Sequence, residues 1–251
     1  MRFGILLALV FLVPSSSLAQ WKTPWAYDGA TGPDRWSELD PAYALCKAGR
    51  EQSPIDIRSA QPSGAAAIRF DYRAEPLRYL INNGKTIRVN YHDAAGTGSF
   101  LVAGGKQYQL TQFHFHRPSE ETVDGKPYDM EVHLMHQSND GKVAGVVIFL
   151  KAGASNAIVQ KLWDHMPQTE GGEQAIAGVD IDPTGLLPHE LSHFEYMGSL
   201  SAPPCTEGVV WFVLRTPVEV SPAQIAAFAR LYPHDVRPVQ PLNGRIVKEG
   251  R

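Results

Sequence analysis

The stretch QYQLTQFHFH, residues 107–116, decides how the rest of the chain is interpreted. In its second half, histidines and phenylalanines alternate one by one. Side chains two apart on a β-strand point to the same face, whereas direct neighbours point to opposite faces. The stretch therefore predicts a strand that presents His114 and His116 side by side on one face. Phe113 and Phe115 face the other way, into a hydrophobic core.

Short runs of the same kind recur along the chain, and Gly, Asn, Asp or Pro separate them. Dipeptides typical of tight hairpins, Asn83-Gly84, Asp124-Gly125 and Asp140-Gly141, lie between several of the runs. The predicted fold is therefore mainly β: a single domain with a mostly antiparallel sheet and a few peripheral helices. The other strand-like runs are AIRFDY (67–72), TIRVNY (86–91), MEVHLMHQ (130–137), VAGVVIFL (143–150) and VVWFVL (209–214).

Two segments have helical periodicity. Residues 157–166 place apolar side chains on one helical face, with Asn156 as the N-cap and a proline directly after them. Ser221-Pro222 is a favourable cap and first-turn pair for a second helix over 223–232. Neither helix begins with a glycine-rich phosphate loop.

The first 19 residues resemble a targeting segment rather than part of the fold. A basic residue, a short apolar run and small residues up to Ala19 predict a secretory signal peptide over 1–19. A membrane anchor is the alternative, but this apolar run is too short to span a bilayer, and no later run is long enough. The predicted mature domain, 20–251, begins with an aromatic-rich arm over 20–50. A formal net charge of −3 offers no broad basic surface for nucleic acid.

The chain has two cysteines, Cys46 and Cys205. In an exported protein, an even pair most simply forms one disulfide. The alternative is a pair of buried free thiols.

A third histidine lies on the run MEVHLMHQ, where Glu131, His133 and Met135 share one face. If this strand pairs with 107–116, three imidazoles converge on one point. Three neutral imidazoles with one open coordination position are typical of a catalytic zinc site. A structural zinc instead has all four positions filled by protein ligands, often thiolates. The His-x-His pair alone also suits jelly-roll proteins that bind iron, nickel or manganese, and it can arise by chance.

Two polar residues strengthen the zinc interpretation. Gln112 and Glu131 lie two positions before His114 and His133, on the same strand faces. Metal-bound histidines usually donate their other N–H to an oxygen acceptor, and these side chains could supply one each. The alternative is that both are ordinary polar residues of a strand.

At this point the chain resembles a known family, the α-class carbonic anhydrases, over nearly all of 20–251. The resemblance rests on motifs that occur in the family's order and with similar spacing. They are WAYDGATGPDRW (25–36), REQSPIDI (50–57), LINNGK (80–85), QFHFH (112–116), SEETVDG (119–125), EVHLMH (131–136), GSLSAPPC (198–205), VVWFVL (209–214) and RPVQPLNGR (237–245).

The resemblance implies a large twisted, mostly antiparallel sheet and the reversible hydration of carbon dioxide to bicarbonate and a proton. Zinc-bound hydroxide would attack carbon dioxide, with weak esterase activity as a possible side reaction. His114, His116 and His133 would be the zinc ligands, with Gln112 and Glu131 supporting them.

The resemblance also assigns groups around the metal. Ser201 would accept a hydrogen bond from the hydroxide and donate its own proton to Glu120, which aims the nucleophile. An apolar wall would hold carbon dioxide without hydrogen bonds, although its residues could equally be plain core. Met135, Leu200, Val209 and Trp211 match the family's positions for this wall.

Two departures from the family are visible. The family's threonine pair is Ser201-Ala202, which keeps the first hydroxyl and removes the second. Fast members have a histidine after Asn-Asn-Gly that relays protons to buffer, and this chain has Lys85. A lysine is ordinarily protonated at neutral pH and accepts no proton there, so we expect turnover to depend on buffer. Tyr27 and His92 are other possible relays.

Two alternatives to a zinc carbonic anhydrase stay open: a binding protein on the same fold, and a different metal enzyme with His-x-His ligands. Export fits the periplasm or the outside of a cell. The predicted partners are carbon dioxide and bicarbonate, without nucleic acid and without a membrane span after signal cleavage. An oligomer is compatible with the sequence.

Overall fold

The computed structural model describes residues 23–62, 65, 67–91 and 98–251. The predicted signal peptide over 1–19 and His92 lie outside these ranges, so the prediction for each of them stays open. Among the described residues, no helix is long and apolar enough to span a membrane.

The helical elements are short, and the first five follow one another in the N-terminal arm. They are η1 (Gly29–Thr31), η2 (Pro33–Arg35), α1 (Trp36–Leu39), η3 (Pro41–Tyr43), α2 (Leu45–Ala48), α3 (Ala157–Trp163), η4 (Pro183–Leu186) and α4 (Pro222–Ala229), where η denotes a 3-10 helix.

Strands make up most of the ordered body. They are β1 (Asp56–Ile57), β2 (Gln61–Pro62), β3 (Ile68–Asp71), β4 (Glu75–Pro76), β5 (Leu80–Asn82), β6 (Ile87–Asn90), β7 (Phe100–Ala103), β8 (Lys106–His116), β9 (Thr122–Val123), β10 (Met130–Gln137), β11 (Val143–Ala152), β12 (Asp180–Ile181), β13 (His193–Ser199), β14 (Glu207–Val220) and β15 (Lys248–Gly250).

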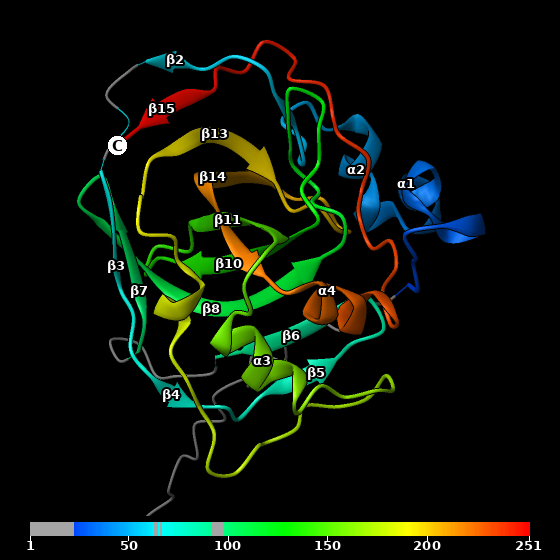
Figure 1. The fold of residues 1–251 in the computed structure, drawn as a ribbon. Coiled ribbons are helices and arrows are strands. Elements are labelled where there is room, and N and C mark those ends of the chain that lie inside the picture. Colours follow the sequence, from blue (N-terminus) through cyan, green and yellow to red (C-terminus); the bar gives the residue numbers. More distant parts are fainter. Residues whose placement is uncertain (1–22, 63–64, 66, 92–97) are drawn as a thin grey trace, which may run out of the picture.

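One 11-stranded sheet organises the molecule, in the order β2-β15-β13-β14-β11-β10-β8-β6-β5, with β7 also paired to β8 and β3 paired to β7. Figure 1 shows this order running from top to bottom, with α3 and α4 in front of the sheet and α1 and α2 at its side. Neighbouring strands are antiparallel except β11 with β14 and β15 with β2. The prediction of a mainly β, mostly antiparallel fold is confirmed. Two further two-stranded sheets pair β1 with β9 and β12 with β4.

The pairing of β8 with β10 positions the candidate site. His114 lies opposite His133, and Phe115 lies opposite Val132. Further along, Met135 pairs with Gln112 but His136 pairs with Leu110, so Thr111 is an extra, bulged residue. A bulge of this kind shifts the alternation of a strand by one position. It explains why the core face of β8 uses even-numbered residues before Thr111 and odd-numbered residues, Phe113 and Phe115, after it.

Both faces of the central strands are covered. Phe113 and Phe115, fully buried, belong to the larger hydrophobic cluster, which also includes apolar residues of α3 and α4. A smaller cluster on the opposite face contains Met135 and Trp211. The histidine face of β8 and β10 is therefore the one that meets the smaller cluster.

Both predicted helix caps are present. The Asn156 side chain accepts hydrogen bonds from the first turn of α3, and Ser221 forms a capping box with Gln224 at the start of α4. Both helices end earlier than predicted. α3 stops at Trp163 because the next residues change to tighter hydrogen bonds, such as Met166 N to the Trp163 carbonyl.

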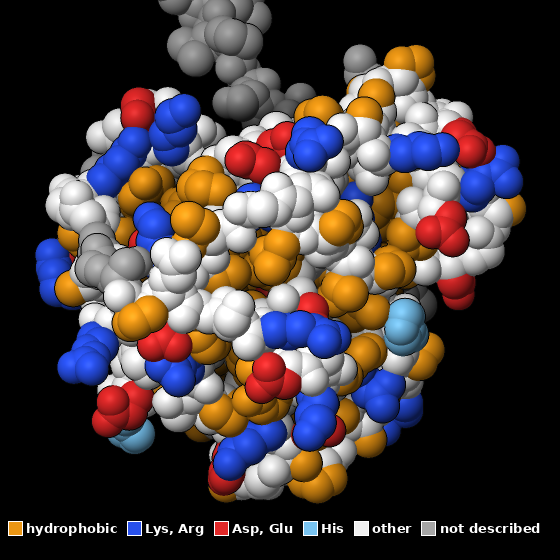
Figure 2. Space-filling view, turned by 90° about the horizontal axis from the view of Figure 1, so that it is seen from above, with side chains coloured by type: hydrophobic (Ala, Val, Ile, Leu, Met, Phe, Trp, Pro, Cys, Tyr) orange, Lys and Arg blue, Asp and Glu red, His pale blue; other side chains and the backbone are white. Residues whose placement is uncertain are grey.

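The N-terminal arm packs on the body through a cluster of aromatic rings around Cys46 and Cys205, which form a disulfide. Trp25 and Trp36 contact edge to face with ring centroids 5.1 Å apart. The predicted disulfide is thus present. On the face shown in Figure 2, basic and acidic side chains are interspersed rather than gathered into one basic patch.

Candidate metal centre

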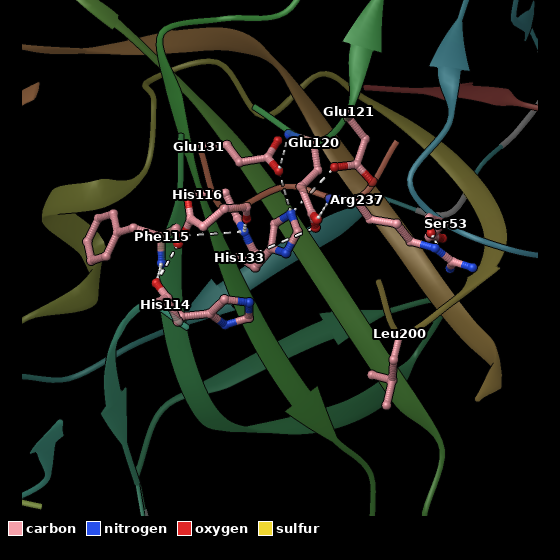
Figure 3. Close-up of polar contacts among 12 residues, drawn as sticks. Ser53, His114, Phe115, His116, Glu120, Glu121, Glu131, His133, Leu200 and Arg237 are labelled. Carbon is pink, nitrogen blue, oxygen red and sulfur yellow. Dashed lines mark hydrogen bonds and ion pairs between the residues drawn. The ribbon is translucent and has the colours of Figure 1, made fainter. Parts of the chain in front are cut away.

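Three imidazoles from two neighbouring strands meet at one point. His114 and His116 come from β8 and His133 comes from β10. Their ring centroids are 4.7–5.2 Å apart, and one ligand nitrogen from each lies within 4.8 Å of the others. Figure 3 shows the three side chains gathered together, with several carboxylates above and beside them. The predicted convergence depended on these strands being neighbours, and they are.

Each imidazole has one nitrogen directed at an oxygen atom. His114 Nδ1 lies 2.8 Å from Gln112 Oε1, and His133 Nε2 lies 2.9 Å from Glu131 Oε1. His116 Nδ1 lies 2.7 Å from the carbonyl oxygen of Asp235. These contacts select the tautomers and leave His114 Nε2, His116 Nε2 and His133 Nδ1 as the atoms available to a metal.

The residues fit a metal ion. His116 Nε2 and His133 Nδ1 are both buried without a hydrogen-bond partner, which is costly unless something else uses their lone pairs. Imidazole nitrogen suits zinc, and three imidazoles leave the fourth tetrahedral position open. His114 is only partly buried, in contrast to the other two, so the histidine cluster borders solvent at His114.

The protonation of the imidazoles follows from their surroundings. Burial, and then the two neighbouring imidazoles, lower the pKa of His114 well below its usual value. Burial also lowers the pKa of His116, against the opposing effect of Glu120. Both rings are therefore neutral and can donate lone pairs to a cation.

His133 differs from the other two because carboxylates surround it. Burial works to lower its pKa, but Glu131 and Glu121 outweigh burial and raise the pKa well above its usual value. Burial, followed by the charge of Glu121, raises the pKa of Glu131 to about 8. A metal at Nδ1 must therefore displace a proton that the carboxylates favour, so its affinity decreases as the pH falls.

Glu120 and Ser201 are both buried, and Glu120 Oε2 lies 3.6 Å from His116 Nε2. Glu120 Oε1 accepts a hydrogen bond of 2.8 Å from the backbone N–H of Arg237, and Oε2 has no hydrogen-bond partner. Ser201 lies on the loop after β13 and is 7% exposed. Among the described residues, no hydrogen bond joins the Ser201 hydroxyl to Glu120, although Oε2 offers an acceptor for one.

An apolar wall flanks His133. The Trp211 ring centroid lies 4.9 Å from that of His133, and Met135 and Val209 are buried in the same cluster, with Leu200 packed against it. Gly145 belongs to this wall too, because a Cβ at this position would lie 2.3 Å from the Trp211 ring. Ala202 packs instead on the aromatic cluster of the arm.

Comparison with known proteins shows the family of the chain that carries this centre. The sequence profile of the eukaryotic-type carbonic anhydrase family matches residues 31–251. The chain belongs to this family. A carbonic anhydrase from Nostoc sp. strain PCC 7120 is 47% identical over 90% of the chain and 85% of the relative. A carbonic anhydrase from Klebsiella pneumoniae is 40% identical, with 90% of each chain covered.

The fold agrees with those of solved family members. The α-carbonic anhydrase of Thermovibrio ammonificans, in a complex with the inhibitor sulfanilamide, superimposes with a TM-score of 0.85. It is 41% identical, and the match covers 90% of this chain and 99% of that one. Membership of the carbonic anhydrases supports hydration of carbon dioxide as the activity of this chain.

Lys85, predicted from the sequence to occupy the proton-relay position, is directed toward the N-terminal arm. Its ammonium group lies 5.4 Å from the ring centroid of Trp25 and donates a hydrogen bond of 3.3 Å to the Gly84 carbonyl. Tyr27 lies edge-on to His116, with ring centroids 6.3 Å apart. Burial, and then nearby carboxylates including Glu120, raise the pKa of Tyr27 well above its usual value, so it stays protonated.

Three further residues support the carbonic anhydrase centre and were not predicted. Asp235 supplies the carbonyl for His116, Arg237 holds Glu120, and Glu121 lies 3.4 Å from His133. Asp235 and Arg237 are more than 100 positions from their partners, and backbone groups carry these contacts, so residue type gives no signal. Glu121 had a usable signal, because it directly follows Glu120 in an otherwise polar turn.

Proposed function

We propose that this chain is an exported zinc carbonic anhydrase that catalyses the reversible hydration of carbon dioxide to bicarbonate and a proton. The observation that carries the proposal is the set of three imidazoles, each oriented by an oxygen acceptor, whose remaining nitrogens face one point beside an apolar wall. His114, His116 and His133 would bind the zinc ion, and Gln112 and Glu131 would orient two of them.

Zinc bound there would supply a water whose pKa is about 7, the value already known for carbonic anhydrases as a class. The chain's own residues then position the reactants. The wall formed by Met135, Leu200, Val209 and Trp211 would hold carbon dioxide, which needs no hydrogen-bond donor. Ala202, which packs on the aromatic cluster of the arm, adds no second hydroxyl next to Ser201.

Ser201 and Glu120 would orient the nucleophilic oxygen. Glu120 Oε1 is occupied by the Arg237 backbone, so Oε2 is the oxygen that can receive the Ser201 proton. As a carboxylate, Glu120 can only accept, which makes the Ser201 hydroxyl a donor to it and leaves a serine lone pair for the nucleophile. A small error in such an alignment is costly, because misplacement by about 1 Å can lower a rate about 100-fold.

This arrangement predicts opposite outcomes for two substitutions at one position. Ser201→Ala removes the hydroxyl, and we expect kcat/KM for hydration to fall about 100-fold. Ser201→Thr keeps the hydroxyl and restricts its rotamer, so turnover should remain close to that of the wild type. Stopped-flow hydration assays on both variants, with zinc content measured in parallel, test the role. A sharp loss in Ser201→Thr would contradict it.

Proton release is expected to limit turnover. A lysine ammonium group has donors but no acceptor, Lys85 lies over the Trp25 ring, and the raised pKa of Tyr27 keeps its hydroxyl protonated. We therefore expect kcat to rise with added imidazole buffer. We expect Lys85→His to raise kcat at low buffer, while kcat/KM changes little. If turnover does not respond to buffer and Lys85→His gives no gain, proton release is not the step that limits turnover.

Zinc analysis combined with a hydration assay tests the proposal against its alternatives. A binding protein on the same fold would hold a ligand without rapid hydration, and a different metal enzyme would contain another ion. One zinc per chain with rapid hydration that sulfanilamide inhibits is the expected result. Weak hydrolysis of activated esters is expected alongside, since the same nucleophile attacks them.

Export of the chain is part of the proposal. The Cys46–Cys205 disulfide supports an oxidising compartment such as the periplasm, with 1–19 removed as a signal and 20–251 as the mature enzyme. The partners would be carbon dioxide and bicarbonate rather than nucleic acid or membrane, and the oligomeric state is left to measurement.

A further inference from the structure

Glu121 is a buried carboxylate that contacts a proposed metal ligand and that the mechanism above does not use. It lies in the turn before β9 and is 1% exposed. Its Oε1 accepts a hydrogen bond of 2.8 Å from the Tyr196 hydroxyl, and its Oε2 lies 3.4 Å from His133 Nε2. Figure 3 shows it beside Glu120, on the same side of His133 as Glu131.

Glu131 already occupies the better position for the imidazole N–H. Its Oε1 lies 2.9 Å from His133 Nε2 and also accepts a hydrogen bond of 2.7 Å from the Glu120 backbone N–H. One N–H cannot satisfy two carboxylates. Glu121 therefore places negative charge behind His133 and limits the movement of the imidazole ring. It does not form a second hydrogen bond of full strength.

Among the described residues, the positive charge beside Glu121 and Glu131 is that of His133 itself when it is protonated, and no lysine or arginine adds to it. The Oε2 atoms of Glu121 and Glu131 are both buried without a hydrogen-bond partner. In the part of the chain that the structure describes, neither forms an ion pair with a lysine or arginine, and the Arg237 guanidinium donates to Gln52, Ser53 and Cys46 instead. One imidazolium can compensate only one of two buried carboxylates, so a divalent cation beside the imidazole makes the arrangement more favourable.

We propose that Glu121 is a positioning residue for the metal, a second carboxylate behind His133 that strengthens binding of the ion. The inference rests on the proposed function, because it assumes a divalent cation at His133 Nδ1. In that position a cation neutralises both carboxylates through the imidazole. Glu121 is thus less favourable in the metal-free protein than in the metal-bound one.

A purely structural role for Glu121 predicts something different. Its bond to Tyr196 joins the turn before β9 to β13, and a carboxylate that served only this purpose would stabilise the fold whether or not metal is bound. The two roles therefore differ in the sign of their effect on the metal-free protein.

The test uses Glu121→Gln, which removes the charge and keeps the shape. The zinc dissociation constant is measured by chelator competition, and the unfolding midpoint is measured on the metal-free protein. We expect zinc affinity to fall about 10- to 100-fold, the usual effect of losing a partner of a metal ligand. We expect the metal-free midpoint to stay the same or rise. Tyr196→Phe, which keeps the charge but removes the donor to Glu121, should weaken zinc binding far less.

Three outcomes would overturn the inference, and none of them resembles failure of the proposed function. The first is unchanged zinc affinity in Glu121→Gln with a lower metal-free midpoint. The second is unchanged affinity with an unchanged midpoint. The third is an equal loss of zinc in Glu121→Gln and Tyr196→Phe, which would indicate local loosening instead of charge. A wild-type protein that binds no zinc would instead contradict the proposed function.

Discussion

Replacing His133 by alanine is expected to abolish both zinc binding and carbon dioxide hydration. Even the loss of an outer partner of a metal ligand commonly costs 10- to 100-fold in affinity, so removal of the ligand itself should exceed about 100-fold. His133 is also the imidazole that connects the metal to Glu131 and Glu121. Without it, two buried carboxylates face the site with no imidazole between them and the ion. Zinc content and stopped-flow hydration measure the effect.

The chain contains a well-matched control for this substitution. His136 lies on the same strand, is equally buried, and points to the opposite face, where its Nε2 lies 2.7 Å from the Tyr72 hydroxyl. His136→Ala should reduce the unfolding midpoint but retain one zinc per chain. A His133→Ala protein that binds zinc as tightly as the wild type would refute the assignment of this ligand.

Removal of the disulfide is expected to produce the largest loss of stability. Cys46 and Cys205 are 159 residues apart in sequence, so their bond closes most of the domain into one loop. In the chain-entropy model, a loop of this length contributes about 5 kcal/mol, chiefly by restricting the unfolded state. Cys46→Ser combined with Cys205→Ser should therefore lower the free energy of unfolding by about this amount. Denaturant unfolding of the two proteins measures the difference.

The double variant also tests how much the bond contributes to the native state. Gln52 Nε2 donates to the Cys205 carbonyl, and Arg237 Nη2 donates to the Cys46 carbonyl, so hydrogen bonds hold both ends as well. We therefore expect the variant to retain zinc and measurable hydration at low temperature. A loss of less than about 1 kcal/mol, well below the usual range for disulfides, would show that the unfolded chain is already restricted.

Much of the fold was predictable because most strands either bury one face in the core or are buried on both faces. The alternation in QFHFH placed Phe113 and Phe115 in the core and the two histidines opposite, and the structure agrees. The strand β13 and the full length of β14 were not predicted, because glycine, charged and polar residues interrupt their apolar pattern. Nothing local indicated that β11 and β14 pair in parallel, since that depends on how distant segments meet.

In the candidate site too, some residues could be predicted from the sequence and others could not. Gln112 and Glu131 could be proposed from spacing because each shares a strand face with its histidine. The partner of His116 could not, because a backbone carbonyl carries no information in its side chain and Asp235 is distant in sequence. The orientation of Lys85 toward Trp25 also required the folded arm, since a sequence shows the type of residue but not the ring it contacts.

The contacts of Asp235 and Arg237 have a consequence for when the enzyme becomes active during its biogenesis. Both residues come after all three histidines in the sequence, and they complete the support of His116 and Glu120. Synthesis proceeds from the N-terminus, so a nascent chain that already contains all three histidines still lacks these supports. If the centre holds zinc as proposed, tight binding of the metal would be a late event, and a truncated polypeptide that lacks Asp235 and Arg237 should not compete with the complete fold for it.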